Sequence, residues 1–273
     1  MMIRRRSLSR GWYPESREEV EENIGRWERE TADASPEKGS AGIAPHAGWF
    51  FSGRLAWRVV SRLVPAGTVV LLGGHRSRRD PPTCWEEDAF ETPCGLLEAD
   101  GTLRDRLARE TGAVPDGSPD NTVEVLLPLV KAAFPDARAV CLRVPPSPAA
   151  ERLRMVLAEQ AAGGASIAVL ASTDLTHYGP NYGFAPRGSG KAAEEWVRTV
   201  NDRDFLEAAV RKEARRMVEL GRDGKAACSA GAAAAAAVFA SARGLEGRLL
   251  EYATSLDRQP STSFVGYGAV LYV

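Results

Sequence analysis

The chain lacks the features that mark several large classes of protein. Its 273 residues carry a formal net charge of only −1, so nucleic acid, which is bound through an excess of basic charge, is not an expected partner. The four cysteines form no Cys-x-x-Cys pair, which excludes the usual zinc-finger and thioredoxin patterns. In a reducing compartment we expect all four to be free thiols.

No segment has the length and hydropathy of a membrane span. The longest weakly polar run, residues 228–242, is mostly alanine and is shorter than the ~20 apolar residues that a span requires. The N-terminal Met-Met-Ile-Arg-Arg-Arg has the basic start of a secretion signal, but polar and aromatic residues follow it instead of an apolar core. We therefore expect a cytoplasmic protein with no membrane partner.

Short apolar runs alternate with segments of helical periodicity along most of the chain. This alternation predicts an α/β fold with a central mixed sheet flanked by helices. No shift of composition marks a boundary, so we expect one domain over residues 1–273. The C-terminal run has period-two character and is expected to pair antiparallel within the sheet.

The expected elements follow from this periodicity. After a charged loop at 31–40 comes a first strand, and further strands are expected at 68–72, 137–144, 166–171, 248–254 and 263–273. Residues 76–92 are expected to be irregular. Helices are expected at 14–27 with Ser16 as its cap, and at 52–63, 102–111, 124–134, 149–161, 191–220 with a break near 201–202, and 228–242.

The chain has only three histidines, and each follows a short apolar run. His46 lies in Ala-Pro-His-Ala-Gly, His75 ends Leu-Leu-Gly-Gly-His, and His177 follows the strand expected at 166–171. In open α/β sheets, ligands bind at the carboxyl ends of the strands, and imidazole is the commonest metal ligand. A single histidine in this position is more often structural, but three in the same context favour one shared metal or catalytic site.

The residues beside two of these histidines predict rigid turns. Pro45 fixes the backbone before His46, and Ser52 is placed to cap the helix that follows. The two glycines before His75 can also cradle a phosphate, although the Gly-Lys-Ser/Thr ending of a P-loop is absent. The alternative for His46 is a structural histidine that bonds to the backbone, and the alternative for His75 is a solvated histidine in a turn.

Two further residues are candidates for the same site. Asp174 lies three residues before His177, so on a helical turn it would orient the imidazole or would instead cap the helix. Cys228 opens the alanine-rich run, where a helix N-terminus favours the metal-binding thiolate; the alternative is an inert buried cysteine. Three imidazoles and one thiolate suit zinc, copper or iron.

These segments resemble the Memo family, known in bacteria and archaea as AmmeMemoRadiSam system protein B. The chain departs from the family where Glu-His-Ser-x-Glu reads Asp-Asn-Thr-Val-Glu, so Asn121 replaces a histidine. The spacing of Leu-Gly before His75 is one residue shorter, and Cys94 replaces a leucine. The matching pieces are aromatic-Tyr-Pro at 12–14, Pro-His-Ala-Gly-aromatic and Ser-Gly within 45–53, Leu-Gly and a histidine at 72–75, Thr-Pro-x-Gly at 92–95, Ser-Thr-Asp-x-x-His-aromatic-Gly at 172–179, the cysteine at 228 and Gly-Tyr at 266–267.

The resemblance implies a class III extradiol dioxygenase-like fold whose cleft is lined by His46, His75, His177 and Cys228. With Asp174 in support, these residues would hold iron, copper or zinc in a metal-dependent, dioxygenase-like oxidoreductase that takes a small molecule or peptide. One alternative is a non-catalytic peptide- or metal-binding module that acts with radical-SAM and AMMECR-type proteins. Another is thiol hydrolysis, with Cys228 as nucleophile and His177 as base.

Overall fold

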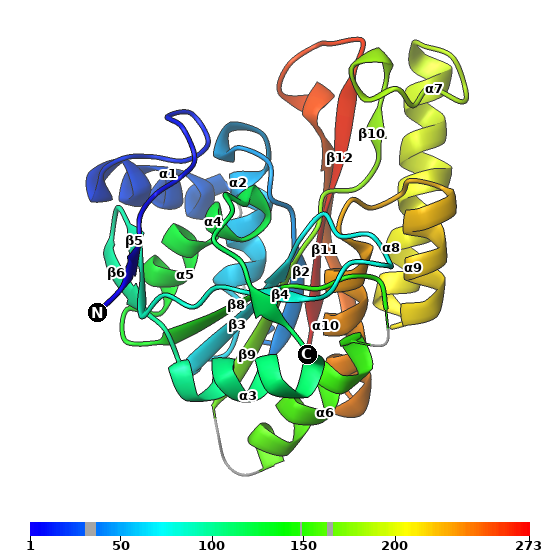
Figure 1. Ribbon diagram of the computed structural model, residues 1–273. Coiled ribbons are helices and arrows are strands. Elements are labelled where there is room, and N and C mark those ends of the chain that lie inside the picture. Colours follow the sequence, from blue (N-terminus) through cyan, green and yellow to red (C-terminus); the bar gives the residue numbers. More distant parts are fainter. Residues whose placement is uncertain (31–36, 148, 163–165) are drawn as a thin grey trace.

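A large mixed sheet forms the centre of the molecule (Figure 1). The structure is a computed structural model that describes residues 1–30, 37–147, 149–162 and 166–273. The middle of the sheet consists of four parallel neighbours, in the order β2 (Ala41–Ala44), β9 (Ile167–Ser172), β3 (Thr68–Gly73) and β8 (Arg138–Arg143). Nearly all their residues are buried, which is typical of parallel strands covered on both faces. The predicted α/β class is confirmed.

Antiparallel pairing extends the sheet at both edges. The C-terminal strand β12 (Phe264–Tyr272) pairs antiparallel with β2, with β10 (His177–Tyr178) and with β11 (Gly247–Thr254), as predicted for this run. At the other edge β4 (Thr83–Cys84) pairs antiparallel with β8 and parallel with β7 (Val114–Pro115).

A separate small sheet contains three strands. It has the order β1 (Ile3–Arg4), β5 (Ala89–Thr92) and β6 (Gly95–Glu98). Because β4 and β5 fall within residues 76–92, the prediction that this region is irregular is wrong in part. Each of these strands is only two to four residues long, which is too short to show a period in the sequence.

Helices cover both faces of the large sheet, and successive side chains of a strand point to opposite layers. In β3, Val70 and Leu72 belong to one apolar core, and Val69 and Leu71 to the other, as the two-residue period of a strand requires. The first core contains side chains of α3 (Gly101–Thr111), α6 (Ala149–Ala162), α8 (Asp202–Val210), α9 (Ala214–Asp223) and α10 (Ala230–Ala242). The second contains side chains of α1 (Arg17–Glu30), α2 (Trp49–Val60), α4 (Asn121–Glu124) and α5 (Leu127–Ala133).

The alanine-rich helix α10 is buried almost throughout, as predicted. Its small side chains allow it to pack against α6, α9 and three central strands at once. The closest approach is at Gly231, where an added Cβ would lie 2.4 Å from the carbonyl oxygen of Val144. No helix among the described residues is long and apolar enough to cross a membrane.

The start of α2 differs from the prediction. The helix begins at Trp49 after Gly48, and no side chain caps it, so the expected cap by Ser52 is wrong. Ser52 lies within the helix, and its hydroxyl donates to the carbonyl of Ala47 at 3.1 Å. Burial of Trp49 against Trp27, at 5.3 Å between ring centroids, explains why the aromatic residues already belong to the first turn. In contrast, the N–H of Glu19 donates to the predicted cap of α1, the Ser16 hydroxyl, at 3.2 Å.

Two other helical segments are divided differently from the prediction. The expected helix at 124–134 is interrupted at 125–126, between α4 and α5. The segment 191–220 contains α7 (Lys191–Trp196), a π-helical turn (Val197–Asn201), α8 and α9. Its break lies at 211–213 rather than near 201–202, because Lys212 adopts a φ of 60°, outside the right-handed helical region. The charged loop expected at 31–40 lies partly outside the described residues.

A buried carboxyl group at the start of α8 has no charged hydrogen-bond partner among the residues that the structure describes. Asp202 accepts hydrogen bonds from the N–H of Thr176 at 3.0 Å, from its hydroxyl, and from the hydroxyl of Tyr252 at 2.8 Å. Burial raises the pKa of Asp202 to about 7, although these hydrogen bonds act in the opposite direction. The folded state therefore holds this proton more tightly than the unfolded state does.

We predict that Asp202 makes stability depend on pH. The contribution of Asp202 to the free energy of unfolding is present in full below its ordinary pKa of 3.8. This contribution is lost as the pH rises toward 7, because only the folded state must then keep a proton or bury a charge. Asp202→Asn should remove part of this fall, which reaches at most about 1.4 kcal/mol per unit of pKa shift. Urea denaturation over this pH range measures it, with the exposed Asp204→Asn as control. Parallel curves for wild type and Asp202→Asn would contradict the prediction.

Candidate metal centre

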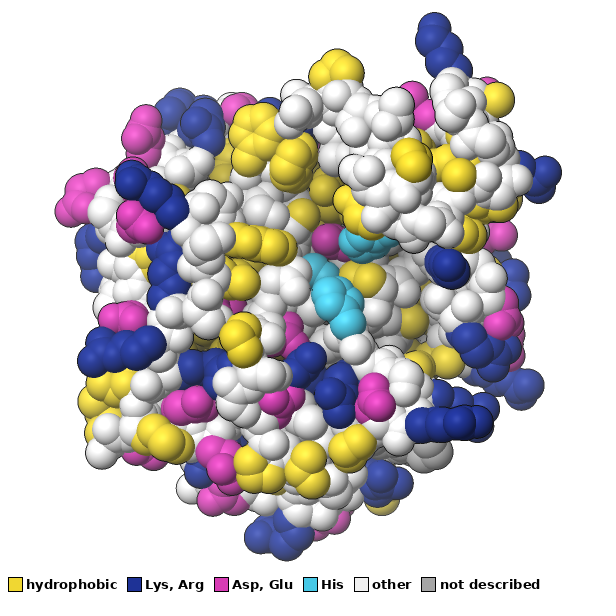
Figure 2. Space-filling model, turned by 45° about the horizontal axis from the view of Figure 1, so that its top comes forward, with side chains coloured by type: hydrophobic (Ala, Val, Ile, Leu, Met, Phe, Trp, Pro, Cys, Tyr) yellow, Lys and Arg dark blue, Asp and Glu magenta, His cyan; other side chains and the backbone are white. Residues whose placement is uncertain are grey.

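The carboxyl ends of β2, β9 and β3 lie side by side at one edge of the sheet. The register pairs Ala44 with Ser172 and Ala171 with Leu72, so the segments that follow these strands leave the sheet together. Ligands bind at this edge in open α/β sheets. In Figure 2 the histidine side chains, in cyan, lie in a hollow of the molecular surface.

Three of the predicted residues form a cluster of potential metal ligands. One donor atom each of His46, His75 and Cys228 lies within 4.8 Å of the other two. Sγ of Cys228 is 3.3 Å from Nε2 of His46, close to the ~3.3–3.8 Å between ligand atoms of one tetrahedral ion with ~2.0–2.3 Å bonds. The two imidazole rings meet edge to face, with centroids 5.3 Å apart.

The cluster extends from the core to the surface. His46 is buried, Cys228 is half-buried and His75 is exposed. Burial lowers the pKa of His46 well below its usual value, and the neighbouring His75 and His177 lower it further. His46 is therefore a neutral imidazole, the form that binds metal. Its Nδ1 lies 2.5 Å from the hydroxyl of Ser172, which orients Nε2 toward Cys228.

His177 lines the same cavity but does not belong to the cluster of three. Its Nδ1 donates to the carbonyl of Leu175 at 3.1 Å, and its ring packs edge to face against Tyr182 at 5.0 Å. The residue lies in strand β10, so the helical turn expected from Asp174 to His177 is wrong. A role for His177 as a fourth ligand stays a prediction.

Asp174 supports the cluster in another way than we expected. Its Oδ1 accepts a hydrogen bond from the backbone N–H of His46 at 2.7 Å, and its Oδ2 lies 4.0 Å from Nε2 of that histidine. Its carbonyl oxygen accepts from the backbone N–H of Cys228 at 3.1 Å. Burial raises the pKa of Asp174, while His177 and the hydrogen bond from His46 lower it. Asp174 thus joins the segments of two ligands, and the orientation of His177 comes from Leu175.

The expectation of a thiolate at Cys228 is wrong for the chain by itself. The helix α10 begins two residues later, at Ala230, and burial raises the pKa of Cys228 to about 12, with a further contribution from the charge of Asp174. The thiol is therefore protonated at neutral pH. The imidazole beside it is His46 rather than His177, so the predicted nucleophile–base pair is not formed. All four cysteines are free.

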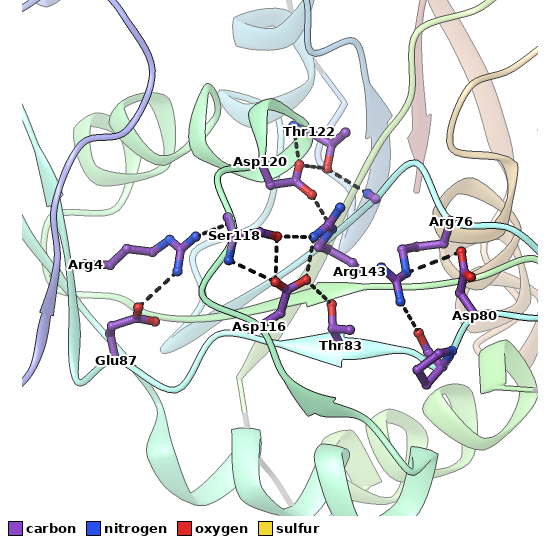
Figure 3. Close-up of polar contacts among 12 residues, drawn as sticks. Arg4, Arg76, Asp80, Thr83, Glu87, Asp116, Ser118, Asp120, Thr122 and Arg143 are labelled. Atoms are coloured by element: carbon purple, nitrogen blue, oxygen red, sulfur yellow. Dashed lines mark hydrogen bonds and ion pairs between the residues drawn. The ribbon is translucent and has the colours of Figure 1, made fainter.

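A buried polar network fixes the turn that carries His75 (Figure 3). Arg143, at the end of β8, pairs with Asp120, which accepts hydrogen bonds from the N–H of Thr122 at 2.6 Å and from its hydroxyl. The same hydroxyl accepts from the N–H of Gly74 at 2.7 Å. Gly74 has a φ of 102°, which favours glycine. Sequence reasoning missed this network, because its members belong to three separate segments; Asp120 and Thr122 lie in the Asp-Asn-Thr-Val-Glu segment, but nothing in the sequence links that segment to Gly74 or Arg143.

A cavity of about 640 Å³ lies over the histidines. Asn121, which stands where the resembled family has a histidine, is part of its wall, so this departure changes the site itself. The N-terminal segment that includes Trp12 forms another wall. Buried Glu124 holds this segment in place, because it accepts from the N–H groups of Ser7 and Leu8 at 2.9 and 2.8 Å and from the hydroxyl of Tyr13 at 3.0 Å.

Comparison with known proteins gives matches along the whole chain. The model of the Memo-like protein family matches residues 4–271. A MEMO1 family protein of Thermococcus onnurineus is 28% identical over 292 residues, and one of Pyrococcus abyssi is 30% identical over 297 residues; each alignment covers 99% of both chains. One of Methanosarcina barkeri is 31% identical over 147 residues, 50% of this chain and 54% of its own. The family match therefore includes every segment of the site.

We predict that Asp174 contributes to metal affinity through His46. Asp174→Asn should weaken metal binding by about 10- to 100-fold, because the amide lacks the charge that strengthens the hydrogen bond to the His46 N–H. Calorimetric titration with a divalent metal measures this, and Asp136→Asn, at an exposed position, is the control. If a folded Asp174→Asn variant bound metal as tightly as wild type, Asp174 would have no part in the metal centre.

Proposed function

This chain belongs to the Memo-like protein family, and from that premise we propose that His46, His75 and Cys228 form a redox-active metal centre of an oxidoreductase. The family shares the class III extradiol dioxygenase-like fold. The observation that carries the proposal is the position of three donor atoms within 4.8 Å of one another, at the ligand-binding edge of the sheet and beside a cavity of about 640 Å³.

The donor set fits iron or copper, and also zinc. Imidazole suits all three metals, and a cysteine sulfur adds preference for softer ions. Three protein ligands leave a coordination position open, which is typical of catalytic sites rather than of closed structural ones. A redox metal held there would supply electron transfer to or from a substrate in the cavity.

The remaining residues of the cavity have separate tasks in this proposal. Asp174 holds the His46 segment and the Cys228 segment together. His177 donates from Nδ1 to the Leu175 carbonyl, so its Nε2 is free to accept a proton from a substrate or return it. Tyr182 packs on the His177 ring and limits its rotation. This arrangement separates metal binding from proton transfer.

Metal analysis combined with turnover tests the proposal. Protein purified without oxygen should contain about one iron or copper ion per chain, held by three protein ligands. His46→Ala and Cys228→Ser should lose the metal, whereas His177→Ala should keep it and lose turnover, measured as dioxygen consumption with phenolic and carboxylate compounds. Wild-type protein that binds neither iron nor copper would overturn the proposal.

A second candidate function is supported by the exposure of His75. A ligand at the molecular surface can pass a metal to another protein, as expected of a metal-delivery module acting with radical-SAM or AMMECR-type proteins. Full metal loading without turnover, together with transfer of the ion to such a partner, would favour this candidate. Loss of transfer in His75→Ala would then identify the exposed ligand as the route.

Metal binding should release about one proton from the thiol at neutral pH. Burial raises the pKa of Cys228 to about 12, whereas His46 is already neutral, so coordination must displace the thiol proton. Metal affinity should therefore rise with pH by about tenfold per unit. Calorimetry in two buffers of different ionisation enthalpy counts the protons. Cys94→Ala leaves the three ligands in place and should keep this release; a buffer-independent enthalpy for wild type would contradict the prediction.

A further inference from the structure

A second cavity adjoins the metal cluster at Cys228. Its volume is about 680 Å³, and Cys228 is part of its wall, whereas His46 and His75 line the first cavity. Its walls come from residues 76–78 after His75, the loop 146–147 after β8, helix α9 and one side of α10. The cluster is therefore bordered by two cavities of different composition.

Basic side chains dominate the charge of this second cavity. Four arginines line it against a single acidic residue, Glu219. The arginines are Arg76, Arg78, Arg215 and Arg222. This excess is local, because the whole chain has a net charge of −1. An excess of one sign inside a concave surface attracts ligands of the opposite sign.

The arginines differ in how far their charge is already compensated. Arg222 is paired with Asp223 through two hydrogen bonds of 2.6 and 2.7 Å. Arg78 makes no ion pair with any residue that the structure describes. Arg215 pairs with Glu219 at 3.0 Å, but its side chain is 94% exposed, so this pair is weak and exchangeable. Arg76 lies 3.9 Å from Asp80 and also donates to a backbone carbonyl. The cavity thus contains guanidinium groups that are available to a ligand.

The rest of the wall is mostly apolar. Beside Ser77 and Ser147, it contains seven small or medium apolar side chains, namely Pro146, Ala214, Val218, Ala227, Ala230, Ala234 and Val238. Guanidinium groups bind carboxylates and phosphates in a bidentate manner, and an apolar wall stabilises the hydrocarbon part of a ligand. This combination suits an organic anion better than an inorganic one.

We infer that this second cavity binds a small organic anion, with its carboxylate or phosphate group at the arginines and its apolar part directed along α9 and α10 toward Cys228. The inference goes beyond the proposed function, because this ligand reaches the metal cluster from the Cys228 side, whereas the substrate that exchanges a proton with His177 lies in the first cavity. It assigns this second ligand to the class of amphipathic carboxylates and phosphate esters.

Calorimetric titration of the metal-free protein at constant ionic strength tests this inference. The probes are hexanoate and butyl phosphate, with acetate as a shorter anion and hexanamide as a neutral control. Hexanoate or butyl phosphate should bind saturably, and acetate and hexanamide more weakly, since each buried methylene adds about two- to fourfold in affinity. Binding of only one of the two larger anions would identify the charged group of the ligand.

Two double variants decide whether the anion lies in this cavity. Arg78→Gln with Arg215→Gln should weaken binding about fivefold or more, because two charge-assisted contacts are lost. Arg79→Gln with Arg216→Gln changes the net charge equally but at neighbouring positions that do not line the cavity, so it should have little effect. The inference would be overturned if the wild type showed no saturable binding of the anion, or if both double variants lost affinity for it equally.

Metal affinity of the same variants separates this inference from the proposed function. Both double variants should bind metal as wild type does, because their substitutions leave the three ligands in place. If wild type bound the anion but no iron or copper, the metal centre would fail and the anion site would stand. If it bound metal but no anion, only the second cavity would lose its assignment.

Discussion

The adjacency of β2, β9 and β3 is the constraint on which the rest of the site depends. Because β9 lies between the other two strands, the residue that leaves its carboxyl end can reach both neighbours. Asp174 reaches the β2 side, where its carboxylate accepts from the N–H of His46, and it also reaches the segment before α10, where its carbonyl accepts from the N–H of Cys228. Residues 128 and 54 positions away in sequence are thereby brought to one point. Parallel order explains why the segments after β2 and β3 can bring His46 and His75 to one metal, and the contact with Asp174 adds Cys228 from the segment before α10.

Much of this arrangement is predictable from the sequence. Each buried parallel strand is a short apolar run bounded by polar residues, and helices with strong periodicity, such as α2 and α3, separate these runs. The strand ends then identify His46 and His75 as neighbours in space, because parallel strands share a carboxyl edge. The scarcity of histidine makes this inference sharper, since a chain rich in histidine would place several at the same edge by chance.

The rest depends on tertiary contacts that no local pattern contains. Spacing suggested that Asp174 faces His177, but the backbone between them is not helical, and the nearer partner comes from the β2 segment. The protonation of Cys228 follows from burial and from the charge of Asp174, neither of which a position near a helix start reveals. The support of His75 by Arg143 through Asp120 and Thr122 likewise joins segments that are distant in the sequence.

The electrostatics of the cluster connect these features. Burial raises the pKa of both Asp174 and Cys228, and it lowers that of His46; all three shifts disfavour charge. A divalent cation at the cluster would reverse the first two, because its charge stabilises a carboxylate and a thiolate nearby and can deprotonate a coordinating thiol outright. Neutral His46 needs no such change. Metal binding and loss of the thiol proton are therefore one coupled event, and the Asp174 carboxylate is a neighbour whose negative charge would stabilise the bound cation.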